Sequence, residues 1–198
     1  MQNIIYKSRG QIPWDTQSAF KATNYKSRCE EHMVYCYLKS YVHGADLVIC
    51  TYCFTAEPEK NADISLYLNL NPELGKTLCL NFGFDNLENV YFTDGEKIPA
   101  DGINLECFKA NDEQGFYWCG QITISRHKIK QLFDTVPEEK SVITINFVKT
   151  FENGDFCALA GAPAGENYKP EDNFETFVIL REKLKESYKE LKKTSLKI

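Results

Sequence analysis

The sequence predicts a mainly β protein: an antiparallel β-sandwich of about nine or ten strands, with a short helix near 126–133 and a C-terminal helix. Two observations lead to this prediction. Short runs of alternating apolar and polar residues fill most of the chain from residue 32 to residue 180, and such alternation places one side of each strand in a core. Turn-forming residues separate these runs every 8–14 residues or so, about the spacing of an all-β fold.

Three hairpins account for most of the predicted strands, because short turns join neighbouring runs. They pair 33–38 with 47–55, 103–109 with 112–125, and 141–150 with 155–160. Further strands are expected at 63–71, 77–84, 90–92 and 174–180. Before residue 32 we expect only a short apolar start and an irregular segment around Trp14. We find no repeat or linker, so residues 1–180 are expected to form one domain.

The stretch 112–125 shows the clearest alternation. The residues on one side predict a core face: Phe116, Trp118, Ile122 and Ile124. The other side is polar and carries one aromatic ring: Tyr117, Cys119, Gln121 and Thr123. Ser125 follows as the predicted N-cap of the helix 126–133.

The C-terminal segment 181–198 is predicted to be a basic helix. It holds seven Lys or Arg and three Glu, whereas residues 1–180 hold 16 basic and 25 acidic residues. Its apolar stripe is thin, consisting of Leu184, Tyr188 and Leu191. We expect this helix to pack on the acidic domain or on a partner, including a second copy of the chain.

The overall charge of −5 over 198 residues argues against nucleic-acid binding, which requires a basic surface. No apolar run approaches the roughly 20 residues of a membrane span, and the N-terminus has no apolar signal core. We therefore expect a cytoplasmic protein whose eight cysteines are reduced. A secreted mature form with disulfides remains the alternative.

Motifs that carry catalysis or bind metals are missing from the sequence. Cys50 and Cys53 have the spacing of a redox or zinc pair, but residues three apart in a strand face opposite sides. The three histidines are scattered, and there is no nucleophile elbow, phosphate loop or dinucleotide fingerprint. Acidic pairs fall in predicted loops, where solvated turns explain them. We predict no catalytic residue, no metal ligand and no cofactor.

The aromatic residues point to a ligand. Sugar rings stack their C–H faces on aromatic rings, and their hydroxyls bind amide and charged groups. Trp118 shares the core side of its strand and is assigned to packing. The candidate ligand-binding residues are aromatic or amide side chains with polar neighbours: Trp14, Tyr67, Asn69, Tyr91, Tyr117 and Gln121.

The order of these segments resembles the carbohydrate-binding module family 9-like proteins, which belong with the DOMON-like, jelly-roll-like β-sandwiches. The resemblance rests on short stretches spread over about residues 12–180: Ile12-Pro13-Trp14-Asp15, Ala62 to Asn69 with Pro72, Cys79 to Gly83, Tyr117 to Ser125 with the following helix, and Ile145 to Lys149 with Pro170 to Phe174 and Phe177. It implies the sandwich fold and a carbohydrate ligand.

Four positions depart from the family pattern. Ser65 and Gln121 stand where the family has Glu, Asn69 where it often has Asp, and Ser125 where it has Pro. Because carboxylates are lost, the resemblance does not carry a calcium ion over to this chain.

Three hypotheses of function follow. The first is a non-catalytic carbohydrate-binding module-like protein that binds a mono- or oligosaccharide through exposed aromatics and amides. The second is an interaction or scaffold protein that uses the sandwich face and the C-terminal helix. The third is a sugar-active enzyme, which the missing catalytic motif disfavours.

Overall fold

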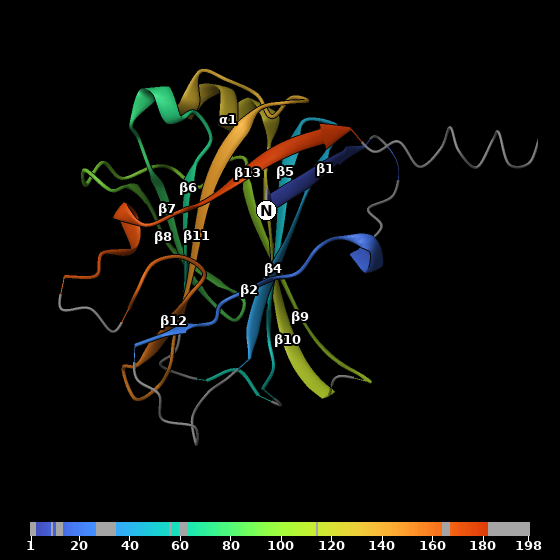
Figure 1. The fold of residues 1–198 in the computed structure, drawn as a ribbon, viewed down its shortest axis with the longest axis vertical. Coiled ribbons are helices and arrows are strands. Elements are labelled where there is room, and N and C mark those ends of the chain that lie inside the picture. Colours follow the sequence, from blue (N-terminus) through green and yellow to red (C-terminus); the bar gives the residue numbers. More distant parts are fainter. Residues whose placement is uncertain are drawn as a thin grey trace, which may run out of the picture.

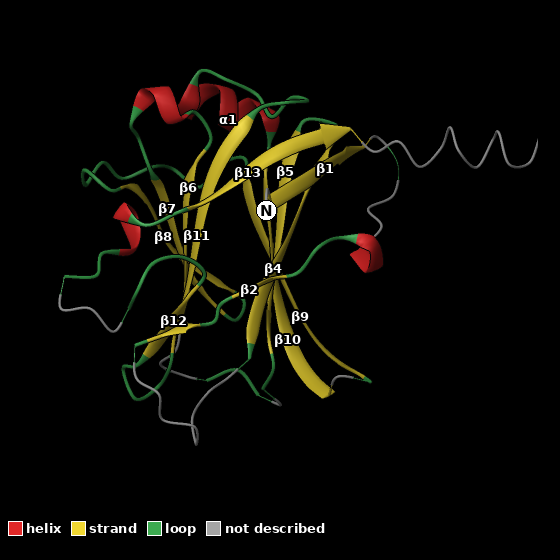
Figure 2. Cartoon of the chain, in the orientation of Figure 1, coloured by secondary structure: helices red, strands yellow, loops and turns green. Residues whose placement is uncertain are grey.

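The computed structural model describes residues 3–8, 10, 14–26, 35–55, 57–59, 63–113, 115–163 and 167–181. In these ranges thirteen strands join in one sheet, and a single α-helix lies across one end of it (Figures 1 and 2). The strands are β1 (Asn3–Ser8), β2 (Phe20–Lys21), β3 (Asn24–Tyr25), β4 (Cys36–His43), β5 (Asp46–Cys53), β6 (Ile64–Asn69), β7 (Leu78–Gly83), β8 (Asn86–Phe92), β9 (Ile103–Asp112), β10 (Gly115–Ile124), β11 (Val142–Thr150), β12 (Phe156–Ala158) and β13 (Glu175–Arg181). The α-helix is α1 (Arg126–Phe133), and the 3-10 helices are η1 (Trp14–Thr16), η3 (Pro72–Leu74) and η4 (Pro170–Asp172).

The sheet folds over so that its two halves face each other. Its main order is β8-β7-β6-β11-β13-β1-β4-β5-β10-β9. Figure 1 shows β6, β7, β8 and β11 on the left and β4, β5, β9 and β10 on the right, with β13 and β1 running between them. The core fills the space between the halves, where Leu38, Ile49, Leu66, Leu80 and Ile145 are fully buried.

The predicted antiparallel sandwich is wrong in its topology. The sheet is mixed and nearly barrel-shaped, because β1 lies between β13 and β4 and runs parallel to both. Ile5 pairs with Ile179, and Tyr6 pairs with Tyr41 on the other side. The short apolar start of the chain is therefore the strand that joins the two halves. It is held there because its apolar side chains enter the core, where Ile5 is 0% exposed.

The predicted hairpins are confirmed. β4 pairs with β5, β9 with β10, and β11 with β12, all antiparallel. Helix α1 spans the predicted residues, and the Ser125 hydroxyl accepts a hydrogen bond from the Lys128 amide at 3.3 Å. Residue 181, where the C-terminal helix was predicted to begin, ends strand β13, and the rest of that predicted helix lies outside the described residues. Residues 12 and 13 of the segment before Trp14 lie outside them as well.

The core side of β10 is confirmed with one correction. Trp118, Ile122 and Ile124 are buried, and Gly120 lies so close to the facing layer that a Cβ there would approach Phe82 Cε2 to 2.7 Å. Phe116, however, is 60% exposed. The tip of the β9–β10 hairpin leans away from the other layer (Figure 1). Phe116 therefore lies on the same side of the strand as Trp118, but beyond the end of the core.

Candidate functional site

The six predicted ligand-binding residues lie on two separate outer surfaces. One group lies on the outer side of β4, β5 and β10: Trp14, Tyr117 and Gln121. The other group lies on the outer side of β6, β7 and β8: Tyr67, Asn69 and Tyr91. The core lies between these surfaces, so the six residues cannot form one site. We call the surfaces the β4–β5–β10 face and the β6–β7–β8 face.

The β4–β5–β10 face carries a cluster of rings: Tyr35, Tyr37, Tyr52, Phe54 and Tyr117. Strand pairing sets them side by side, since Tyr37 lies opposite Tyr52, and Phe54 donates its backbone N–H to the Tyr35 carbonyl at 3.0 Å. The Tyr37 and Tyr52 rings stack at 4.6 Å, and Phe54 contacts Tyr35 and Tyr117, both at 5.3 Å. The rings therefore form one continuous cluster.

The centre of this cluster is closed. Tyr37 and Tyr52 are only 7% and 8% exposed, and Trp14 from η1 packs against the cluster. The Lys39 ammonium lies 5.9 and 5.8 Å from these two ring centres and donates to the Trp14 carbonyl at 2.8 Å. Burial raises the pKa of Tyr37 to about 12. The ring faces of Tyr37 and Tyr52 are therefore covered, whereas the rings at the edge of the cluster remain partly exposed: Trp14, Tyr35, Phe54 and Tyr117.

The polar side chains of this face are also engaged. The Cys50 thiol donates to Gln121 Oε1 at 3.4 Å. Cys119, expected on an outward polar side, is fully buried because it lies between Tyr52 and Phe108 on the neighbouring strands. The pair Cys50 and Cys53 does face opposite sides, since Cys50 belongs to this cluster and Cys53 to the main core.

The β6–β7–β8 face has a different construction. Tyr67 and Tyr91 lie on either side of Cys79, with which both are paired across the strands. Two strand spacings put their Cα atoms about 10 Å apart. In the part of the chain that the structure describes, neither ring contacts another aromatic ring. Both remain partly exposed.

Amide groups surround these two tyrosines. The Cys79 thiol donates to Asn81 Oδ1 at 3.2 Å, and Asn69 Oδ1 accepts from the Asn71 amide at 3.1 Å. Burial raises the pKa of Tyr67 and, to about 12, that of Tyr91; it also raises the pKa of Cys79 to about 11. All three groups are therefore neutral at physiological pH, and the tyrosine hydroxyls can donate as well as accept.

Asn146 holds a neighbouring segment against this face. It is fully buried and pairs with Tyr67 across β11 and β6. Its Nδ2 donates to the Tyr168 hydroxyl at 3.1 Å and to the Pro170 carbonyl at 3.0 Å, and its Oδ1 accepts from Phe147 at 2.9 Å and Ala160 at 3.1 Å. These bonds place η4, and with it Glu171, beside the tyrosines.

Sequence reasoning missed Cys79, Asn81, Asn146 and Glu171. Cys79 and Asn81 could have been found from the alternation of their strand, which predicts that they share a side. The same alternation places Asn146 on the outer side of its strand with Thr144, but its hydrogen-bond partners are distant in sequence and left no signal. Glu171, with Asp172, is one of the acidic pairs that fall in predicted loops and that solvated turns explain.

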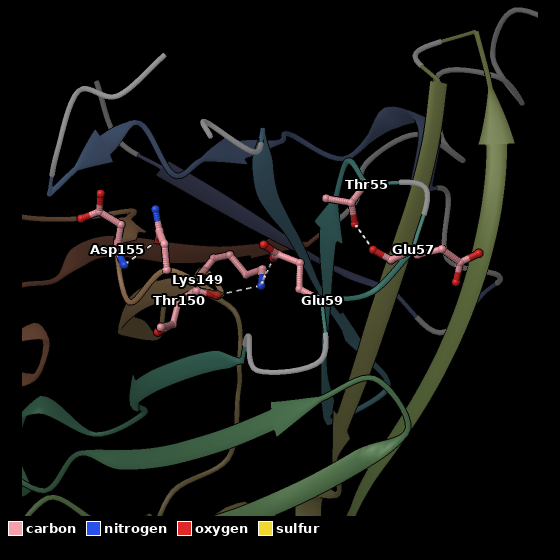
Figure 3. A network of polar contacts seen from close by, with 7 residues as sticks. Thr55, Glu57, Glu59, Lys149, Thr150 and Asp155 are labelled. Atoms are coloured by element: carbon pink, nitrogen blue, oxygen red, sulfur yellow. Dashed lines mark hydrogen bonds and ion pairs between the residues drawn. The ribbon is translucent and has the colours of Figure 1, made fainter. Parts of the chain in front are cut away.

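A buried ion pair lies at one end of the core (Figure 3). Lys149 is fully buried, and its ammonium contacts Glu59 Oε2 at 2.9 Å and the Thr150 carbonyl at 2.8 Å. Nearby, the Thr55 hydroxyl donates to the Glu57 carbonyl at 2.9 Å. A buried ammonium is costly without partners, so we assign Lys149 to holding the segment around Glu59 against β11.

Other sites are weaker candidates. A hollow of about 430 Å³ beside α1 is lined by Arg126, Lys130, Asp134, Thr135, Val136, Glu138 and Ser141, none of which the sequence analysis selected. Within the described ranges no group of three His, Cys, Asp or Glu residues could hold a metal ion. No helix there is long and apolar enough to cross a membrane.

Comparisons with known proteins identify relatives in fold. No protein-family model matches the sequence, and no curated protein sequence matches it. Among solved structures, a protein of Bacteroides uniformis ATCC 8492 described as a putative carbohydrate-binding protein is similar, with a TM-score of 0.68 at 8% identity. The match covers 90% of this chain and 99% of that one.

Two structures of a carbohydrate binding module family 9 from Caldicellulosiruptor kristjanssonii are also similar. The complex with cellotriose has a TM-score of 0.62 at 11% identity and covers 91% of this chain and 95% of that one. The complex with glucose has a TM-score of 0.61 at 10% identity, with coverages of 91% and 97%. The resemblance to family 9 modules is thus confirmed at the level of the fold.

Proposed function

We propose that this chain is a non-catalytic carbohydrate-binding protein that binds a mono- or oligosaccharide on its β6–β7–β8 face. One observation carries the proposal: Tyr67 and Tyr91 flank the small Cys79 without packing on other rings, amid the amides of Asn69 and Asn81. Two tyrosines whose Cα atoms lie about 10 Å apart, with only a small side chain between them, offer their rings to one sugar ring from two sides.

The chemistry of the face suits an uncharged polyol. Neutral tyrosine hydroxyls and amides donate and accept hydrogen bonds, which is what sugar hydroxyls require. The solved structures with the same fold include modules in complex with glucose and cellotriose, which supports these sugars as the first ligands to test.

The test is calorimetric titration with glucose and cellotriose. We expect a double variant, Tyr67→Ala with Tyr91→Ala, to lose affinity at least about tenfold, since each ring contact contributes about 1 kcal/mol. The matched control, Tyr35→Ala with Tyr117→Ala, removes two partly exposed rings from the other face and should leave affinity unchanged. The proposal fails if wild type binds no sugar in a broad screen, or if only the control loses affinity.

A role in protein interaction is the second candidate, favoured by the β9–β10 hairpin. Phe108 and Phe116 are 43% and 60% exposed there, and β9 ends the order of the sheet, where an unpaired strand edge can bind another strand. Sedimentation of wild type and of a Phe108→Ser, Phe116→Ser variant tests it. Concentration-dependent association of the wild type that the variant loses would support it; a monomeric wild type without a captured partner would not.

A further inference from the structure

We propose that Glu171 is a specificity-determining residue, which makes the β6–β7–β8 face favour cationic amino sugars over neutral sugars and disfavour sugar acids. This inference rests on the proposed function and adds to it the charge class of the ligand.

The position of Glu171 is set by the strand beneath it. Pro170 accepts a hydrogen bond from Asn146 Nδ2 at 3.0 Å, and Asn146 lies opposite Tyr67 in the β11–β6 pairing. Glu171 is the next residue, in the short helix η4. The Tyr168 hydroxyl, which donates to the Ala160 carbonyl at 2.9 Å, ties the segment down from its other side. The carboxylate is therefore carried on a fixed support beside the tyrosine pair.

The electrostatic influence of Glu171 reaches both tyrosines and the cysteine between them. Its negative charge adds to the effect of burial in raising the pKa of Tyr67, Cys79 and Tyr91. The charge of Asp63 acts on Cys79 in the same direction. A ligand held between the tyrosines would lie in the same negative field.

Lys97 lies opposite Tyr91 in an isolated bridge and is exposed, so its charge offsets part of this field beside Tyr91. On the side of Tyr67, the cation of the neighbouring strand does not. Lys149 of β11 shares the core side with Ile64, its partner in β6, and is paired with Glu59. Residues 1–180 also carry more acidic than basic groups, 25 against 16, so the wider field has the same sign. An ammonium group on a sugar would be attracted, and a carboxylate repelled.

The test compares three ligands that differ mainly in charge: glucosamine, glucose and glucuronate, titrated by calorimetry at roughly pH 6, where an amine is protonated and a carboxylate ionised. We expect glucosamine to bind about two- to fivefold more tightly than glucose, and glucuronate more weakly by a similar factor, which is the range of partly exposed ion pairs. Added salt should reduce both differences.

The decisive variant is Glu171→Gln, with Asp172→Asn as its matched control. Asp172 is the next residue of η4 and is exposed, so the control removes the same net charge from the same helix. Glu171→Gln should bind the three sugars almost equally, whereas Asp172→Asn should keep the order. Equal binding of the three sugars by wild type, or an unchanged order in Glu171→Gln, would overturn the inference while leaving sugar binding intact. If wild type binds none of the three, the proposed function fails with it.

Discussion

The two outer faces of this molecule carry similar residues but use them differently. On the β4–β5–β10 face the rings stack on one another, and Tyr52 is only 8% exposed. On the β6–β7–β8 face the small Cys79 separates Tyr67 from Tyr91, and amides fill the surroundings. Aromatic content alone therefore does not define a binding surface. The spacing of rings across strands decides whether they form a second core or remain available to a ligand.

The largest expected effect is on stability, and it follows from removing a ring of the β4–β5–β10 face. Tyr52→Ala removes a nearly buried ring from the β4–β5–β10 face and should lower the free energy of unfolding by about 3 kcal/mol. Sugar affinity should stay within about twofold, since the ring lies on the other face. Urea denaturation followed by circular dichroism measures the first quantity and calorimetry the second. A loss of affinity with unchanged stability would reverse the roles that we assign to the two faces.

Asn146→Ala should affect both stability and binding. It leaves the Ala160 amide and the Pro170 carbonyl without their partner, at a cost of about 2 kcal/mol, and it releases η4 from the β6–β7–β8 face. We expect sugar affinity to fall severalfold. Asn24→Ala is the control, because Asn24 Nδ2 binds the carbonyls of Ala158 and Leu159, directly before the Ala160 amide that Asn146 also binds. That control should lose stability only; an equal loss of affinity would show that the anchor is not specific.

Removing a single hydroxyl should have a smaller effect. Tyr91→Phe keeps the ring but loses a neutral donor, so affinity for glucose should fall by about 1 kcal/mol, or roughly fivefold. Tyr117→Phe on the other face should change nothing. Titration of both variants measures the difference, and an unaltered affinity in Tyr91→Phe would limit Tyr91 to ring contacts.

The smallest effect concerns alkaline pH. Burial raises the pKa of Tyr37 on one face and of Tyr91 on the other, each to about 12. Each group therefore adds stability that is fully present below the unfolded-state pKa of about 10 and is lost as pH rises towards 12. Thermal unfolding between roughly pH 8 and 12 should show this decline, and Tyr37→Phe and Tyr91→Phe should each make it shallower. A variant whose decline is as steep as that of wild type would contradict the assignment of its tyrosine.

Local features of the fold could be predicted from the sequence. Alternation over 112–125 anticipated β10 and its buried Trp118, and Ser125 anticipated the start of α1. Each of these depends on contacts between residues close in the chain. The insertion of β1 between β13 and β4 could not be predicted, because alternation gives the sides of a strand but not its partners.

Only part of the candidate site could be predicted from the sequence, for the same reason. Parity correctly put Tyr67 and Tyr117 outside the main core, but it could not show that they lie on different faces. Asn146 acts through Tyr168, Pro170 and Ala160, all more than ten residues away. Glu171 becomes a candidate only because the hydrogen bond from Asn146 to Pro170 places it beside the tyrosines. Residues that support a site across the fold leave no local pattern.

The most direct test of the contrast is a nuclear magnetic resonance titration of the isotope-labelled chain with glucose or cellotriose. We predict that amide shifts concentrate at Tyr67, Cys79, Asn81 and Tyr91, while Tyr37, Tyr52 and Tyr117 report no binding. Shifts concentrated on the β4–β5–β10 face would contradict the account, because the closed ring cluster would then be the surface that opens to the ligand.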